Sequence, residues 1–163
     1  MRVARVTTVA AIVVMALLVA PSAPASAAPT GTERLTLVTT SFTLDTASGR
    51  VVATGPVAGA GTFFQGPGDV YEMTVDLPQG DLFLLVENTS FTIDTNERAC
   101  VDRFSGTESF VVTGGSGAFS GASGRGSDSY RGTTVYPRNA DGTCNFEAVP
   151  RGFIIATAVL TLT

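Results

Sequence analysis

The chain has 163 residues and a formal net charge of −4, with no histidine. Its ten basic residues, all arginine, are outnumbered by 14 Asp and Glu, which argues against nucleic acid or an anionic membrane as a partner. The lack of histidine excludes Ser-His-Asp and Cys-His catalysis, and we expect no cofactor and no metal site, because two cysteines do not supply the four ligands that zinc usually takes.

The N-terminus has the pattern of a secretory signal peptide. Arg2 and Arg5 precede an apolar run from Val9 to Ala20, and small residues follow it. The run is shorter than the ~20 residues that cross a bilayer as a helix. We predict that residues 1–27 are cleaved off and that residues 28–163 form one secreted domain without a stable membrane anchor. A retained N-terminal anchor is the alternative.

Beyond the N-terminus, stretches rich in β-branched and aromatic residues alternate with clusters of Gly, Pro, Asn and Asp. This pattern predicts strands and turns, and no helix of three turns. The predicted strands lie near residues 34–45, 51–64, 70–77, 82–94, 99–104, 107–113, 127–136 and 152–163. Eight strands can close a small barrel, so we predict an all-β fold, an eight-stranded antiparallel β-barrel.

The run from Leu82 to Val86 is apolar at every position, so both faces of its strand are apolar. In the strand predicted at 70–77, by contrast, apolar and polar residues alternate. A strand that is apolar on both faces needs a cover on the second one. The candidates are another subunit, the N-terminal segment and a ligand, and we prefer a contact between copies of the chain.

The hexapeptide SFTLDT at residues 41–46 recurs as SFTIDT at residues 90–95. Each copy precedes a turn and a second predicted strand. A duplicated hairpin in two halves of one barrel explains the echo, and so does chance similarity between Thr-rich strands.

Two cysteines, Cys100 and Cys144, lie in the part of the chain expected to be exported. Exported proteins meet an oxidising compartment, so we predict a disulfide between them. The alternative is a pair of buried free thiols.

The segment Gly114 to Gly126 reads GGSGAFSGASGRG. Glycines let backbone N–H groups approach a phosphate closely, but a phosphate-binding loop needs a helix directly after it. Residues 127–136 alternate as a strand instead. We therefore interpret the segment as a sharply turning connection between strands.

The longer stretch FVVTGGSGAFSGASGRG at residues 110–126 resembles the allene oxide cyclase and dirigent barrels, in which a strand ends in a glycine pair, an aromatic residue and a second glycine cluster. In outline, residues 33–163 are similar to bacterial secreted members of that group. The resemblance implies an eight-stranded antiparallel barrel with an apolar cavity, often assembled as a dimer or trimer. Characterised relatives steer cyclisation or coupling of lipid-like, phenolic or polyketide-like molecules. No local motif matches the catalytic positions of the plant enzymes.

Two glutamates share a strand face with large apolar residues, which makes them candidate catalytic groups. Glu87 has the parity of Phe91 and Ile93, and Glu108 has that of Phe110, so both face the cavity if the strands run without bulges. Burial would raise their pKa values and suit an acid or base near neutral pH. The alternative is a solvated Glu87 at a strand bend and a Glu108 paired with arginine near a strand end.

Three tyrosines and two arginines are candidate ligand-binding residues. Tyr71, Tyr130 and Tyr136 would orient a polar group of a ligand, although barrel tyrosines more often belong to the core with the hydroxyl at the rim. Arg103 and Arg131 would supply a positive charge, and solvated surface arginines are the alternative.

Together these patterns favour a secreted barrel that binds or steers a small, mostly apolar molecule. One alternative is a cyclase or isomerase that uses Glu87 or Glu108 as acid or base with a tyrosine as hydrogen-bond donor. Another is a non-catalytic extracellular structural or interaction module.

Overall fold

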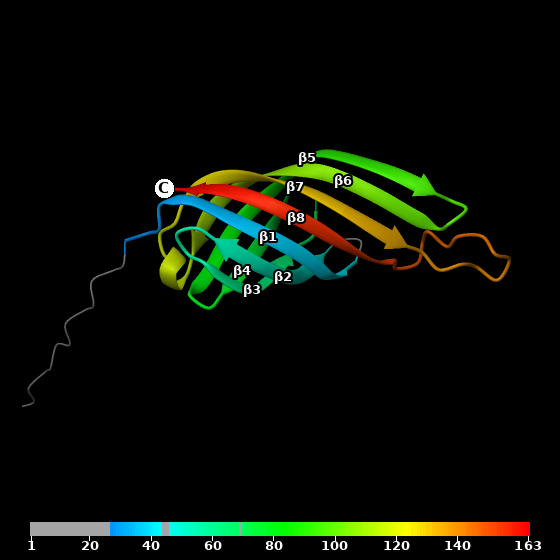
Figure 1. The fold of residues 1–163 in the computed structure, drawn as a ribbon, viewed down its shortest axis with the longest axis horizontal. Helices are drawn as coiled ribbons and strands as arrows, with labels where there is room; N and C mark the ends of the chain where they lie inside the picture. The colour runs from blue at the N-terminus through cyan, green and yellow to red at the C-terminus, as the bar shows by residue number, and fades with distance from the viewer. Residues whose placement is uncertain (1–26, 44–45, 69) are drawn as a thin grey trace, which may run out of the picture.

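A computed structural model describes residues 27–43, 46–68 and 70–163, and it shows one closed antiparallel barrel (Figure 1). The strands hydrogen-bond in chain order, and the last one returns to the first. They are β1 (Gly31–Phe42), β2 (Ala47–Thr54), β3 (Gly59–Gln65), β4 (Val70–Leu77), β5 (Gly80–Asn96), β6 (Val101–Gly115), β7 (Gly124–Val135) and β8 (Arg151–Leu162). The predicted eight-stranded barrel is confirmed. The predicted signal peptide lies outside the described residues, apart from its last position.

Two strand boundaries predicted from the sequence are wrong, and the errors offset each other in the strand count. The stretch 51–64 is two strands, because Gly55 has φ +147° and Pro56 has no N–H to donate to a ladder. The stretches 99–104 and 107–113 belong to one strand, since Gly106 continues β6. A Cβ on Gly106 would collide with the Tyr130 hydroxyl, so this glycine makes room for a side chain inside the barrel.

The half of the barrel nearest the C-terminus is filled with side chains. The short 3-10 helix η1 (Gly117–Phe119) covers this end, and Phe119 is fully buried (Figure 1). Inward-pointing leucines and valines pack around it, among them Leu35, Leu82 and Leu160, none of which is exposed. The glycine-rich segment is thus a connection between β6 and β7, as predicted from the absence of a following helix.

At the other end, the ends of β5, β6, β7 and β8 extend beyond the strands that flank them, and we call this part the overhang (Figure 1). Strand β4 pairs only with residues 80–87 of β5, so residues 88–96 pair with β6 alone. The register between β5 and β6 shifts at Thr89. Because of the extra residue, odd-numbered instead of even-numbered side chains of β5 point inward after Thr89. Phe91 and Ile93 therefore line a pocket on the inner side, where each is 53% exposed. The barrel is therefore open at this end.

A disulfide joins Cys100 to Cys144, with Cα atoms 5.3 Å apart, and confirms the predicted pairing. Cys100 lies in the turn between β5 and β6, and Cys144 lies in the connection between β7 and β8. The Tyr136 N–H also donates to the Cys100 carbonyl at 2.9 Å. The bond thus ties together the two tips of the overhang.

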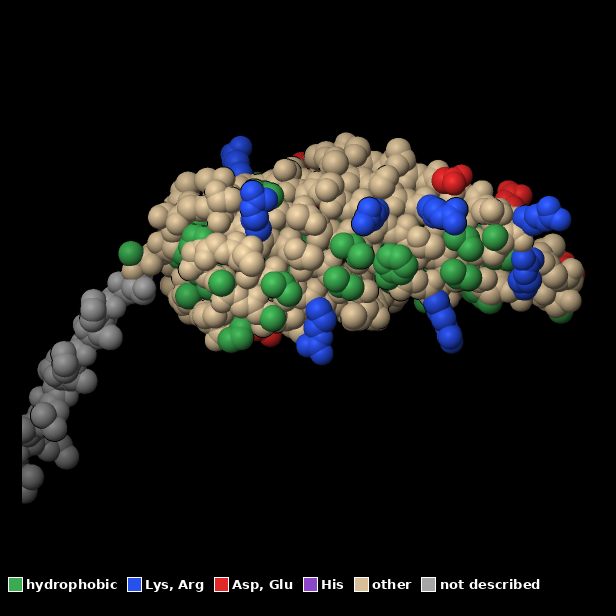
Figure 2. Space-filling model, in the orientation of Figure 1, with side chains coloured by type: hydrophobic (Ala, Val, Ile, Leu, Met, Phe, Trp, Pro, Cys, Tyr) green, Lys and Arg blue, Asp and Glu red, His purple; other side chains and the backbone are tan. Residues whose placement is uncertain are grey.

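The outer surface carries the second apolar face of β5. Phe83 and Leu85 are exposed there, next to Val111 of β6. Figure 2 shows that arginines on the face in view stand apart from one another and form no continuous basic patch. Assembly of copies through the apolar face remains a prediction.

In the part of the chain that the structure covers, no helix has the length and apolarity to span a bilayer.

Replacement of both cysteines by serine tests the role of the disulfide. The bond closes a loop with a sequence separation of 44 residues. For a loop of this size the chain-entropy model gives a stabilisation of about 4 kcal/mol. We expect the Cys100→Ser/Cys144→Ser protein to lose a comparable free energy of unfolding in urea without reductant. An unchanged denaturation midpoint would show that the overhang is held by its strands alone.

Candidate functional site

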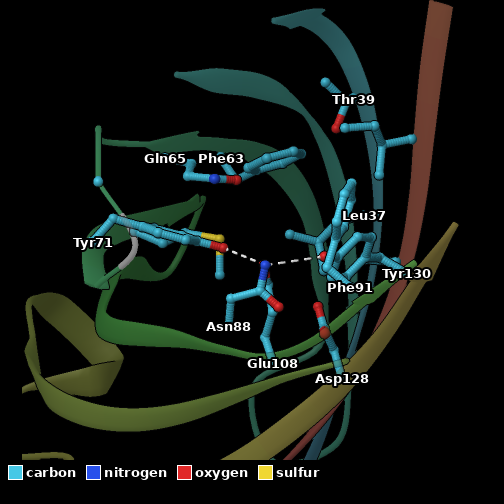
Figure 3. A pocket seen from close by; sticks show the side chains of 14 residues that line it. Leu37, Thr39, Phe63, Gln65, Tyr71, Asn88, Phe91, Glu108, Asp128 and Tyr130 are labelled. Atoms are coloured by element: carbon cyan, nitrogen blue, oxygen red, sulfur yellow. Dashed lines mark hydrogen bonds between the residues drawn. The ribbon is translucent and has the colours of Figure 1, made fainter. Parts of the chain in front are cut away.

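The open half of the barrel holds an inner pocket of about 220 Å³ with apolar walls and one polar side (Figure 3). The apolar walls come from five strands and consist of Leu37, Phe63, Met73, Phe91, Ile154 and Ala156. The main polar side consists of Tyr71, Asn88, Glu108, Asp128 and Tyr130. Thr39 and Gln65 also line the pocket, away from Glu108 and Asp128 (Figure 3). A small ligand would therefore meet apolar surface over most of its body and hydrogen-bonding groups mainly on one side.

The polar side is built from strand register. Asn88 of β5 lies opposite Glu108 of β6, and Glu108 lies opposite Asp128 of β7. Directly opposed residues in antiparallel strands have Cβ atoms about 5 Å apart, so the three side chains form one row across neighbouring strands. The two-residue period of β7 then brings Tyr130 to the same interior face as Asp128.

Two side-chain hydrogen bonds connect this row to the tyrosines. The Tyr71 hydroxyl donates to Oε1 of Glu108 at 2.6 Å, and Nδ2 of Asn88 donates to the Tyr130 hydroxyl at 3.2 Å. Oδ1 of Asp128 is buried and has no hydrogen-bond partner among the described residues. The Asp128 carboxyl group thus contributes a buried, unsatisfied oxygen to this side of the pocket.

Both carboxyl groups hold their protons to a higher pH than exposed carboxyl groups do. Burial raises the pKa of Glu108, and the hydrogen bonds with Tyr71 and Asp128 offset only part of this effect. Burial, and secondly the negative charge of Glu108, raise the pKa of Asp128 to about 8. Two opposed carboxylates in an apolar pocket cannot both ionise at low cost. Near neutral pH we therefore assign at least one proton to the Glu108–Asp128 pair.

The tyrosines of the pocket remain phenols at any ordinary pH. Burial raises the pKa of Tyr71, and the charge of Glu108 and the hydrogen bond to it raise it further. Burial is also the main reason for the raised pKa of Tyr130. Both hydroxyls are consequently available as hydrogen-bond donors.

Three of the candidates from the sequence, Glu108, Tyr71 and Tyr130, come together in this pocket. Glu87 does not join them. Its side chain is exposed and follows the buried Val86, and the bulge at Thr89 separates its parity from that of the inward residues beyond. The assumption of an unbroken strand was wrong at this point.

The remaining candidates lie outside the inner pocket. Arg103 and Arg131 are exposed and alternate with inward residues, so they lie on the outer face. Tyr136 follows β7 and lines a second pocket at the open end. Sequence reasoning missed Asn88 and Asp128 as site residues, although Asp128 shares the parity of Tyr130.

No three His, Cys, Asp or Glu side chains lie close enough to hold a metal ion within residues 27–43, 46–68 and 70–163.

Comparisons of the chain with family models, with curated proteins and with solved structures found no match. The resemblance to the allene oxide cyclase and dirigent barrels therefore stays a prediction.

The raised pKa of Asp128 predicts how stability depends on pH. Between about pH 4 and pH 8, folded protein retains a proton that the unfolded chain has released. Stability must then fall as pH rises through this window. We expect Asp128→Asn to flatten the decline and to be more stable than wild type at pH 9, by on the order of 2 kcal/mol.

Urea denaturation at pH 5, 7 and 9 measures the effect. Asp76→Asn serves as the matched control, because Asp76 is exposed on the outer face of β4. The two variants should differ in the slope of stability against pH. Parallel slopes for Asp128→Asn and wild type would contradict a shared proton in the pocket.

Proposed function

We propose that this protein binds a small, mostly apolar molecule whose carbonyl or hydroxyl oxygen meets the Glu108–Asp128 pair. The observation that carries the proposal is a proton-sharing carboxyl pair set into one side of an apolar-walled pocket. A buried acid that keeps its proton at neutral pH is a strong hydrogen-bond donor to an oxygen that cannot donate. Burial of the ligand's body against Leu37, Phe63 and Met73 supplies the apolar part of the affinity.

The polar row also fixes orientation. A ligand whose oxygen lies beside the Glu108–Asp128 pair has its apolar body confined by walls from β1, β3, β4 and β8. Such confinement holds a flexible molecule in one conformation. The barrel would steer a reaction by favouring the product that forms from this conformation. This proposal agrees with what the resemblance to the allene oxide cyclase and dirigent barrels implies. The signal-like N-terminus and the disulfide support a secreted location.

A pair of probes of similar shape tests the binding mode. 2-Acetonaphthone carries a ketone oxygen, whereas 2-isopropylnaphthalene has a similar outline without it. We expect wild-type protein to prefer the ketone by about fivefold, because a neutral hydrogen bond of this kind contributes about 1 kcal/mol. Glu108→Met/Asp128→Leu should bind both probes about equally, because neither new side chain can donate a hydrogen bond to the ketone. Protein-observed NMR titration gives both affinities.

Glu87→Gln is the control for this experiment, since Glu87 lies on the outside of the strand that carries Asn88. It should leave the preference for the ketone unchanged. The proposed binding mode would be refuted if neither probe binds. It would also be refuted if Glu87→Gln changes the preference for the ketone as much as substitution of the Glu108–Asp128 pair does.

A second function, proton transfer, is favoured by the pKa of about 8 for Asp128. A pair with one proton and one negative charge contains both an acid and a base. The carboxylate of one member would remove a proton from the carbon next to a ligand carbonyl while the other member's proton passes to the carbonyl oxygen, which gives an enol. Delivery of the abstracted proton to a different carbon of the enol, with return of the oxygen-bound proton to the other carboxylate, isomerises the ligand and restores the pair.

Deuterium incorporation into the methyl group of 2-acetonaphthone measures this transfer. In D2O near neutral pD, wild-type protein should exchange the methyl protons faster than an equal concentration of Glu87→Gln/Glu108→Gln protein, and at the same rate as Glu87→Gln. Equal rates for all three proteins would leave binding as the sole function of the pocket.

A further inference from the structure

A second pocket of about 440 Å³ lies at the open end of the barrel, and we call it the mouth pocket. It shares Gln65, Gly68, Phe91 and Ile154 with the inner pocket, so the two pockets adjoin each other. Four aromatic side chains line it, namely Phe42, Phe91, Phe104 and Tyr136. The rings of Phe91 and Phe104 are tilted, with centroids 6.1 Å apart.

The mouth pocket also contains a carboxyl group that is almost completely buried. Asp102 of β6 lies opposite Thr134 of β7, and both line the pocket. Asp102 is 6% exposed, and its Oδ1 has no hydrogen-bond partner among the described residues. Burial, and to a smaller extent the neighbouring Asp102 carboxyl group, raise the pKa of Tyr136. A buried carboxyl oxygen without a hydrogen-bond partner lowers the stability of the folded protein, and a positive group beside it would offset this loss.

The chain itself supplies no such group to the cavity. It contains no lysine, and no arginine of the described residues lines the inner or the mouth pocket. Alternation along β6 and β7 turns Arg103 and Arg131 outward, whereas Asp102, Glu108 and Asp128 turn inward. Among the described residues, those that line the two pockets therefore include acidic groups and no basic ones.

We propose that the mouth pocket binds an organic ammonium group, the cationic head of a ligand whose apolar body enters the inner pocket. Aromatic faces attract cations, and aromatic cages with an acidic neighbour are suited to quaternary or alkylated ammonium. A metal ion would require several oxygen ligands, and Asp102 is the one carboxyl group among the described residues that line the mouth pocket. This inference rests on the proposed function for the place of the apolar body, and it adds the charge of the ligand.

The repeated hexapeptide has a place in this pocket. Phe42 is the second residue of SFTLDT, and Phe91 is the second residue of SFTIDT. Both side chains line the mouth pocket, although the first copy ends β1 and the second lies within β5. Each copy of the hexapeptide thus contributes one aromatic side chain to the same pocket.

Phenyltrimethylammonium and its neutral analogue tert-butylbenzene are the probes that test the inference. NMR titration of wild-type protein should give an affinity for the cation at least about tenfold higher than for the hydrocarbon. Asp102→Asn should abolish this difference and leave the affinity for tert-butylbenzene unchanged. Asp94→Asn is the matched control, because Asp94 is an exposed acid on the same hairpin, and it should behave as wild type.

Phe91→Leu gives a second variant that keeps an apolar wall and removes a ring, and it should lower the affinity for the cation more than that for tert-butylbenzene. Equal affinities of wild type for the two probes, or an unchanged preference in Asp102→Asn, would overturn the inference.

The naphthalene probes separate this outcome from failure of the proposed function. If the Asp102→Asn protein still prefers 2-acetonaphthone to 2-isopropylnaphthalene, it is folded and its inner pocket is intact. A loss of affinity for phenyltrimethylammonium in this variant is then specific to the mouth pocket. If wild type binds none of the four probes, both proposals fail together.

Discussion

A closed antiparallel sheet leaves each side chain two directions, into the barrel or out of it, and the candidate site depends on that constraint. Along β6 the inward positions are Asp102, Glu108 and the apolar residues between and beyond them, and along β7 they include Asp128 and Tyr130. The pairing of β6 with β7 sets Glu108 opposite Asp128. Two carboxyl groups are thereby held side by side away from solvent, which is why they retain a proton.

The barrel divides this interior unequally. Phe119 and the leucines around it fill the end near the C-terminus, whereas the inner pocket lies toward the overhang. At Gly106 the missing Cβ leaves room for the Tyr130 phenol, which lines that pocket. The disulfide joins the tips of the strands that extend farthest, so a covalent link stabilises the part of the sheet with the fewest neighbours.

Much of this arrangement could be predicted from the sequence, because the period of two in β-strands is a local property. Glu108, Tyr71 and Tyr130 were placed inside by parity alone, and the cysteines were paired from their context. The bulge at Thr89 could not be predicted from the local pattern, and it gives Phe91 and Ile93 the opposite facing from Glu87. Glycine was misleading at residue 106 for a similar reason: whether it marks a turn or a close approach is decided by a distant strand.

The central claim is that Glu108 and Asp128 share a proton near neutral pH. Carbon-13 NMR of the side-chain carboxyl carbons, followed from pH 3 to pH 10 in wild-type protein, tests it most directly. The account predicts that the resonance assigned to Asp128 titrates near pH 8, with Glu108 responding in the same steps. Independent titration of both groups near pH 4 would contradict it.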